Sequence, residues 1–237
     1  MYLSWKEQII ADFNESSIEK MYNDGFVFTR KGRGIMNQTR SLRVNLNKFE
    51  LSSENRRVLN KTEDLNLLVS PIPYENYKWT IHKMGKEFYE KKFGEKTPAL
   101  NRPAGSGLVF SAQKIKELIT DERKSNFNKL LVYKKDSDAV GYCIAMETKN
   151  ILHYCYPFYS LQPTTYNLQP TTYNLQPNAG MGMMLKAIVW AKENGKKYIY
   201  LGSFQRPTDT YKLQFSGLEW FDGKEWQNDL EELKKLV

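Results

Sequence analysis

The chain has 237 residues, of which 41% are hydrophobic, 14% aromatic and 26% charged. This composition is enough to bury a sizeable core, and it excludes a disordered, collagen-like or low-complexity chain. No apolar run approaches the ~18 residues of a membrane span, and residues 1–13 are amphipathic with charges throughout, unlike a signal peptide. We therefore expect a soluble cytoplasmic protein without a membrane partner.

The net charge of +8 is unevenly distributed. Between Arg30 and Lys61, nine basic residues are accompanied by only two acidic ones, Glu50 and Glu54. Clustered positive charge attracts polyanions and is typical of proteins that bind nucleic acids. A basic face that is simply solvated explains the same pattern equally well.

The first half of the chain predicts alternating helices and strands. Ser4 and Glu7 can form a capping box, and apolar residues then recur at helical spacing as far as residue 22. The further expected elements are strands over 26–29 and 42–46, a helix capped by Ser52 or Ser53, a strand over 65–72, and a long helix over 77–88 closed by Gly94.

The second half predicts a short helix, three strands, a longer helix and a last strand. Their expected ranges are 111–119, 130–134, 140–147, 151–157, 181–189 and 197–201. A helix between two strands of one sheet implies a right-handed crossover, so the last strand should run parallel to a neighbour in an otherwise antiparallel sheet. The predicted fold class is α/β (α+β), with a basic N-terminal region over 1–105 and a second domain over 106–237.

An internal repeat interrupts the second domain. The heptad LQPTTYN occupies 161–167 and again 168–174. Each copy contains a proline, and seven residues are too few for a solenoid unit. We interpret 161–177 as a duplicated, exposed loop, and a docking segment rich in proline and tyrosine is the alternative.

Gly180 and Gly182 stand where a strand should lead into the helix over 181–189, a place where unpaired backbone N–H groups favour an anion. A glycine-relieved helix entry explains them equally well. Their position resembles that of the N-acetyltransferase superfamily (GNAT), in which an Arg/Gln-x-x-Gly-x-Gly/Ala loop holds the pyrophosphate of the acyl donor. Pro177 occupies the Arg/Gln position here. The resemblance implies a GNAT-like mixed, mostly antiparallel sheet flanked by helices.

The segment 210–219 is similar to the helix and turn that bring a tyrosine to the acyl-transfer centre of many GNAT enzymes, and Tyr211 is the matching residue. A phenol with a reference pKa of ~10 can give a proton to a departing anion while staying neutral at pH 7. An aromatic side chain packed on the sheet is the alternative explanation.

A narrower resemblance rests on separate pieces that span most of the chain, namely 39–49, 52–61, YIYLG at 198–202, and Tyr211-Lys212 followed by Phe215, Glu219 and Trp226. Together they resemble the aminoacyl-tRNA-protein transferases, the arginyl- and leucyltransferases that modify protein N-termini. The resemblance implies aminoacyl-tRNA as co-substrate, a polypeptide N-terminus as acceptor and no further cofactor. The cysteine cluster that these enzymes carry before their first strand is missing from 34–38.

The resemblance also implies roles for particular residues. Tyr211 would supply a proton, and the backbone of Gly180 and Gly182 would donate hydrogen bonds near the tRNA terminus. Contacts to tRNA phosphates or to an acidic acceptor residue would come from Arg40, Arg43, Arg56, Arg57 and Lys212.

Glu147, at the end of its expected strand, is a candidate base for the attacking amine, and a solvated carboxylate is the alternative. His82 and His153 are the only histidines and have no partners at ligand spacing, so we expect no metal site. Two other functions stay open: an N-acyltransferase that uses acetyl-coenzyme A, and a non-catalytic RNA-binding protein.

Overall fold

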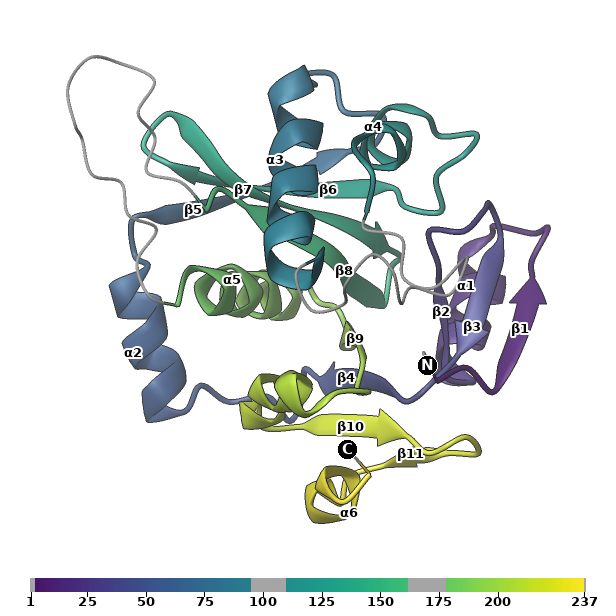
Figure 1. The fold of residues 1–237 in the computed structure, drawn as a ribbon. Helices are drawn as coiled ribbons and strands as arrows, with labels where there is room; N and C mark the ends of the chain where they lie inside the picture. Colours follow the sequence, from purple (N-terminus) through teal and green to yellow (C-terminus); the bar gives the residue numbers. More distant parts are fainter. Residues whose placement is uncertain (1–2, 95–109, 162–177, 237) are drawn as a thin grey trace.

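A mixed sheet of eight strands forms the centre of the computed structural model, which describes residues 3–94, 110–161 and 178–236 (Figure 1). The strand order is β11-β10-β4-β9-β8-β7-β6-β5. The strands are β4 (Ser41–Asn45), β5 (Leu65–Pro71), β6 (Lys129–Lys135), β7 (Asp138–Glu147), β8 (Ile151–Tyr159), β9 (Tyr198–Ser203), β10 (Leu218–Phe221) and β11 (Trp226–Gln227).

All neighbouring strands of this sheet run antiparallel except β8 and β9, which are parallel. The chain passes from β8 to β9 through α5 (Ala179–Glu193). The expected crossover is therefore confirmed, and with it the expected fold class, a mixed, mostly antiparallel sheet flanked by helices.

The other helices are α1 (Glu15–Asn23), α2 (Ser53–Lys61), α3 (Trp79–Tyr89), α4 (Ala112–Thr120) and α6 (Leu230–Lys234), with a π-helical turn η1 (Glu90–Gly94) after α3 and a 3-10 helix η3 (Pro207–Gln214) after β9. Of these, α2, α3 and α4 begin and end close to the residues that the sequence signals predict, whereas α6 was not expected. Ser52 caps α2 in a capping box, and Ser111 caps α4. Within the described ranges, no helix is long and apolar enough to cross a membrane.

A smaller sheet with the order β1-β3-β2 precedes the large one, formed by β1 (Lys6–Ile9), β2 (Phe26–Phe28) and β3 (Ile35–Gln38). The helix predicted from Ser4 is wrong in its first half, because residues 6–9 form a strand and α1 begins only at Glu15. All four residues of β1 are exposed, so their apolar pattern buries nothing, whereas the edge of β3 supplies backbone hydrogen-bond partners.

Strands from both halves of the chain share the large sheet. β4 lies between β10 and β9, and β5 pairs with β6 along its whole length. The expected domain boundary near residue 105 lies outside the described residues. The expected repeat loop over 161–177 does so as well, apart from its first residue, Leu161.

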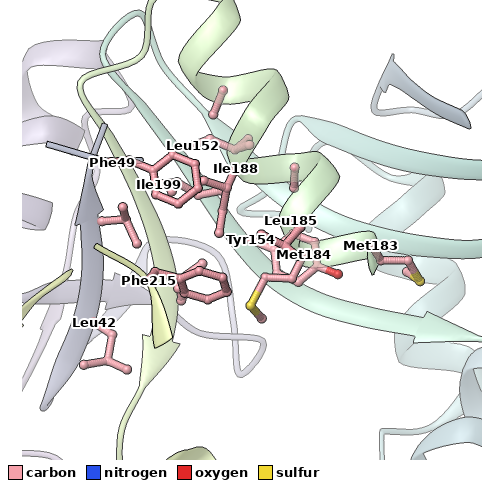
Figure 2. Packing of buried hydrophobic residues seen from close by; sticks show 14 of the residues in the cluster. Leu42, Phe49, Leu152, Tyr154, Met183, Met184, Leu185, Ile188, Ile199 and Phe215 are labelled. Atoms are coloured by element: carbon pink, nitrogen blue, oxygen red, sulfur yellow. The ribbon is translucent and has the colours of Figure 1, made fainter. Parts of the chain in front are cut away.

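The hydrophobic core lies on both faces of the large sheet. Alternating residues of β6 divide between the faces: Leu131 and Tyr133 belong to one cluster, and Leu130 and Val132 to the other. The first cluster is covered by α5 and α2, the second by α3, α4, α1 and the small sheet. Figure 2 shows side chains of α5 packed over β8 and β9 in the first cluster.

Candidate functional site

The strands β8 and β9 separate after a short parallel ladder. Only three residues of each strand are paired, Ile151 to His153 of β8 with Tyr198 to Tyr200 of β9. Beyond this point β8 continues along β7, while β9 continues along β4. The β8 backbone past His153 therefore has no strand partner on its β9 side. We call this place the strand split.

A β-bulge in β8 coincides with the strand split. Tyr154 and Tyr156 lie opposite adjacent β7 residues, so Cys155 between them is the extra residue. Bulges re-aim side chains and end regular pairing, and they are frequent beside active sites. The bulge and the split therefore interrupt regular strand pairing in the middle of the sheet.

The N-terminus of α5 carries further unpaired backbone donors. Its N-cap Asn178 has φ 91° and makes no side-chain capping bond, so the N–H groups of the first turn have no partner within the helix apart from Gly182, which donates to the Asn178 carbonyl at 2.8 Å. Gly180 lies against Tyr159 of β8, since a Cβ at Gly180 would stand 3.2 Å from that ring. This end of α5 thus adjoins the end of β8.

Gly182 faces the opposite way. A Cβ at Gly182 would lie 2.6 Å from Thr62 Oγ1, at the C-terminal cap of α2. The Thr62 hydroxyl is itself held by a hydrogen bond to the Val58 carbonyl at 2.9 Å. Gly182 is therefore a packing residue that lets α5 approach α2, in agreement with the glycine-relieved helix entry.

Tyr211 and Lys212 lie on η3. Tyr211 is 46% exposed, yet desolvation raises the pKa of its phenol to about 12, with the charge of Asp209 and the nearby Tyr159 acting in the same direction. Lys212 is buried; its Nζ donates to the Ser203 carbonyl at 2.9 Å and lies 3.5 Å from Asp209 Oδ1. Burial lowers the pKa of Lys212, and Asp209 opposes this shift. Lys212 thereby ties η3, with Tyr211, to the end of β9.

A row of polar side chains crosses four strands beside the strand split. In the ladders, His153 of β8 lies opposite Tyr200 of β9, Tyr200 opposite Arg43 of β4, and Arg43 opposite Glu219 of β10. Arg43 Nε donates to Glu219 Oε2 at 2.8 Å, and Arg43 Nη1 lies 3.4 Å from Tyr200 Oη. Three of the separate motif pieces, 39–49, 198–202 and Glu219, are thus brought together in one row.

The Arg43 guanidinium is fully occupied within this row. It stacks over the rings of Tyr198 and Trp226, with its Cζ at 4.0 and 3.8 Å from the ring centres. Arg43 is only 7% exposed. The expected phosphate contact would need this side chain to leave Glu219, so we assign Arg43 to the architecture of the sheet.

His153 closes the row at the strand split. Its Nδ1 lies 2.8 Å from Tyr22 Oη, and its Nε2 has no hydrogen-bond partner among the described residues. Burial lowers the pKa of His153 to about 3, with a smaller effect from Lys212 in the same direction. His153 is therefore neutral at pH 7.

The remaining sequence-predicted arginines differ in their freedom to bind a ligand. Arg40 is partly buried, which lowers the pKa of its guanidinium, and its Nη1 donates to the Phe204 carbonyl at 3.5 Å. Arg57 forms two hydrogen bonds with Glu54, at 2.6 and 2.5 Å. Arg56 is exposed and has no ion pair among the described residues.

Other charges of the basic stretch are also used within the protein. Lys31 Nζ lies 2.7 Å from Glu7 Oε2. Arg33 Nη1 donates to the carbonyls of Glu122 and Ser125. The cluster of nine basic residues is therefore a weaker electrostatic site than the sequence indicates, because part of its charge is balanced locally.

Glu147 is not brought together with Tyr211. Its carboxylate lies 2.6 Å from Lys196 Nζ and 3.2 Å from Lys129 Nζ. Glu147 pairs with Leu152 at the start of β8, and the Tyr159 end of β8 is seven residues, or about 23 Å, further along. The structure thus gives Glu147 two lysine partners at the far end of the sheet.

An aromatic group that the sequence did not single out surrounds the strand split. Tyr89 donates from its hydroxyl to the Pro157 carbonyl of β8 at 2.9 Å, and its ring stacks on Phe93 with 5.7 Å between ring centres. Phe93, on η1, is 53% exposed, and the Arg206 guanidinium lies 5.7 Å from its ring centre. The aromatic richness of 151–159 was the available sequence signal; the position of Phe93 had none.

The described residues contain no group of three or more His, Cys, Asp or Glu side chains placed to hold a metal ion. What the site offers is unpaired backbone donors, a neutral phenol and a stacked aromatic surface beside one guanidinium. Such groups can orient an acyl donor and stabilise a developing oxyanion.

No protein-family profile matches the sequence, and no curated protein matches it. Among solved structures, the chain is similar to the C-terminal domain of a protein described as a lysylphosphatidylglycerol synthetase of Agrobacterium fabrum, with 14% identity and a TM-score of 0.45 over 80% of this chain and 52% of that one. It is also similar to L-PGS of Bacillus licheniformis, with 13% identity and a TM-score of 0.44 over 94% and 62% of the two chains.

A third similarity is to the GCN5-related glucosamine N-acetyltransferase region of a fungal multi-domain β-N-acetylglucosaminidase, with 9% identity and a TM-score of 0.42 over 90% of this chain and 22% of that one. Of the first two structures, named in the preceding paragraph, this chain spans about half and about three fifths of the length. At these identities and scores, the similarities do not bear on what this chain does.

Proposed function

We propose that this protein is an acyltransferase that moves an amino acid from charged tRNA to the N-terminal amine of a polypeptide. The observation that carries the proposal is the strand split, where β8 and β9 part and where the first turn of α5 and Tyr211 lie beside the end of β8. An aminoacyl ester is already activated, so the protein needs mainly to hold the amine against the carbonyl and to assist departure of the ribose oxygen.

The chemistry at the split involves one bond formed and one broken. The amine nitrogen attacks the ester carbonyl, and unpaired backbone N–H groups stabilise the oxyanion. As the C–O bond breaks, the Tyr211 phenol gives its proton to the ribose oxygen, and the proton lost by the amine restores the phenol. Lys212 is a positioning residue, because its bond to the Ser203 carbonyl holds η3 in place.

Arg56 and Arg57 provide a matched pair for testing the tRNA contact. A phosphate contact contributes a slope of about 0.7 to 0.9 to the dependence of log affinity on log salt concentration. We expect Arg56→Ala to flatten the slope of tRNA binding by that amount, and Arg57→Ala to change it less, because Glu54 already engages Arg57. Equal slopes for the wild type and Arg56→Ala would exclude Arg56 from the tRNA contact.

The function is tested directly by incubating the protein with a pool of charged tRNAs and peptides of varied N-termini. Mass spectrometry should show a peptide that gains the mass of one amino-acid residue. In parallel, tRNA should raise the melting temperature saturably and acetyl-coenzyme A should not. Saturable stabilisation by micromolar acetyl-coenzyme A, with acetyl transfer instead, would establish the coenzyme A-dependent alternative. Binding of tRNA without transfer would favour the non-catalytic one.

A further inference from the structure

Phe93 and Arg206 form an exposed aromatic and cationic pair at the rim of the strand split. Arg206 is exposed, immediately precedes η3, and makes no ion pair with a carboxylate among the residues that the structure describes. Phe93 is backed by Tyr89, whose hydroxyl is anchored on β8. Phe93 thus keeps about half of its surface exposed beside a guanidinium that has no ion pair among the described residues, on a support fixed to the site.

This combination suits one chemical class of ligand. A nucleobase stacks on an aromatic face, and a guanidinium contacts the adjoining phosphate, as in proteins that bind single-stranded nucleic acids. Arg206 stands five residues before Tyr211, or about 10 Å along a 3-10 helix. A single nucleotide is of the size to bridge that distance.

We propose that Phe93 and Arg206 bind the terminal adenine nucleotide of the acyl donor, with the base on the Phe93 ring and a phosphate at Arg206. This inference rests on the proposed function for the identity of the donor. Both aminoacyl-tRNA and acyl-coenzyme A carry an adenine nucleotide, so the same subsite chemistry serves either source. The experiment has an arm for each.

The first arm measures binding of labelled tRNA with and without its 3′-terminal adenosine. The wild type should bind the intact tRNA about fivefold or more tightly than the truncated one, as expected for one base–aromatic stack. Phe93→Ala should abolish this ratio, and Phe93→Trp should retain it. Arg206→Ala should flatten the salt slope by about 0.7, the value for one phosphate of a single strand.

A matched control exists on α3. Trp79 is 60% exposed, and Lys83 Nζ lies 5.4 Å from its ring centre, so the two are an exposed aromatic and cationic pair away from the strand split, although Lys83 also lies 3.8 Å from Glu87 Oε1. Trp79→Ala with Lys83→Ala should leave the ratio and the slope unchanged. Because Phe93 and Arg206 are exposed, their variants should melt at the wild-type temperature, which separates binding from folding.

The second arm repeats the measurement with coenzyme A and with adenosine monophosphate as competitors. If coenzyme A displaces at micromolar concentration and Phe93→Ala weakens it, the subsite stands and its nucleotide comes from coenzyme A. If Phe93→Ala changes the binding of neither donor, the proposal is overturned.

Peptide modification that persists unchanged in Phe93→Ala would overturn this subsite and leave the proposed function standing. If adenine binding depends on Phe93 but no amino acid is transferred to a peptide, this subsite stands and the proposed function is overturned.

Discussion

Arg43 shows how the surroundings of a residue decide what its charge can do. It lies in a stretch with a net charge of +7, which by itself favours a polyanion partner. In the fold, its guanidinium is paired with Glu219 and stacked between two aromatic rings. A charge held in this way is not available to a ligand, because leaving its partner would place an unpaired charge in a buried position.

Removing one partner of this pair should be strongly destabilising. The side chains of Arg43 and Glu219 are 8% and 13% exposed, so the partner left behind would be a buried, unpaired charge. We expect Glu219→Ala to lower the free energy of unfolding by about 3 to 5 kcal/mol, measured by urea titration. The double variant Arg43→Met/Glu219→Leu should recover most of this loss. A double variant as unstable as the single one would mean that ring stacking, and not charge pairing, dominates.

Tyr211 gives the residue-scale test of the chemistry. Tyr211→Phe removes the proton donor and keeps the ring, so we expect transfer to slow by about 10²-fold or more with an unchanged melting temperature. Because the pKa of Tyr211 is raised to about 12, its phenol stays protonated from pH 6 to 10, and its contribution should be constant over that range. Tyr74→Phe, on a half-buried tyrosine outside the described site, is the control. Equal rates for the two variants would contradict the assignment.

At the scale of elements, the close approach of α5 to α2 decides how a substitution of Gly182 or Gly180 affects stability. In an exposed helix, replacing glycine by alanine stabilises by about 0.5 to 1 kcal/mol. At Gly182, however, the added methyl would lie 2.6 Å from Thr62 Oγ1, which is held by its bond to Val58. The packing therefore reverses the sign expected from helix propensity.

We expect Gly182→Ala to lower the free energy of unfolding by about 1 to 3 kcal/mol, the cost of overpacking a close contact. Gly180→Ala should cost less, because its methyl would lie 3.2 Å from the Tyr159 ring and needs a smaller adjustment. Denaturant unfolding measures both. If Gly182→Ala and Gly180→Ala are equally stable and weaken binding of the acyl donor equally, both glycines would instead contact the bound donor.

At the scale of the whole molecule, the two hydrophobic clusters bury polar groups along with the apolar ones, which makes stability depend on pH. His153 lies among the buried residues of the sheet, with its pKa lowered to about 3 from 6.5. The unfolded chain binds a proton at this group where the folded chain does not. The stability due to neutral His153 is therefore fully present above pH 6.5 and is lost as pH falls toward 3.

The slope of this loss should be about 1.4 kcal/mol per pH unit, the value for one proton, between pH 6 and 4. His153→Gln should flatten the curve, although it lowers stability at pH 7. His82, whose pKa is lowered by partial burial and by Lys116, should contribute a smaller slope of the same sign, removed in His82→Gln. A His153→Gln curve parallel to that of the wild type would show that other groups carry the acid sensitivity.

Much of the fold could be predicted because it depends on local patterns. The hairpin strands β6, β7 and β8 are largely apolar segments joined by short turns, and α5 is a largely apolar helix followed by Gly195. The parallel pairing of β8 with β9 then followed from the handedness of crossovers. The strands β1 and β3 could not be found in this way. The residues of β1 are exposed, and β1 is recognised as a strand only by its pairing with β3.

For the candidate site, the sequence indicated Tyr211 and Lys212 through their resemblance to known transferases, and Gly180 through its place between a strand and a helix. It did not indicate that Arg43 and Glu147 are engaged in ion pairs. Which charged residues form an ion pair depends on the order of the strands in the sheet and on the loops that bring distant parts of the chain together. Glu219, for example, is 176 residues from Arg43.

The sequence by itself therefore determined the helices and strands between residues 111 and 201 and the crossover that joins β8 to β9, since periodicity and capping act over short stretches of chain. It did not determine β10, β11 and α6. The tertiary structure alone decided the order of strands across the sheet, the placement of β4 and β5 beside strands of the other half, and the meeting of Phe93 with Arg206. These contacts join residues far apart in sequence, and they follow from which faces pack together, which no local pattern encodes.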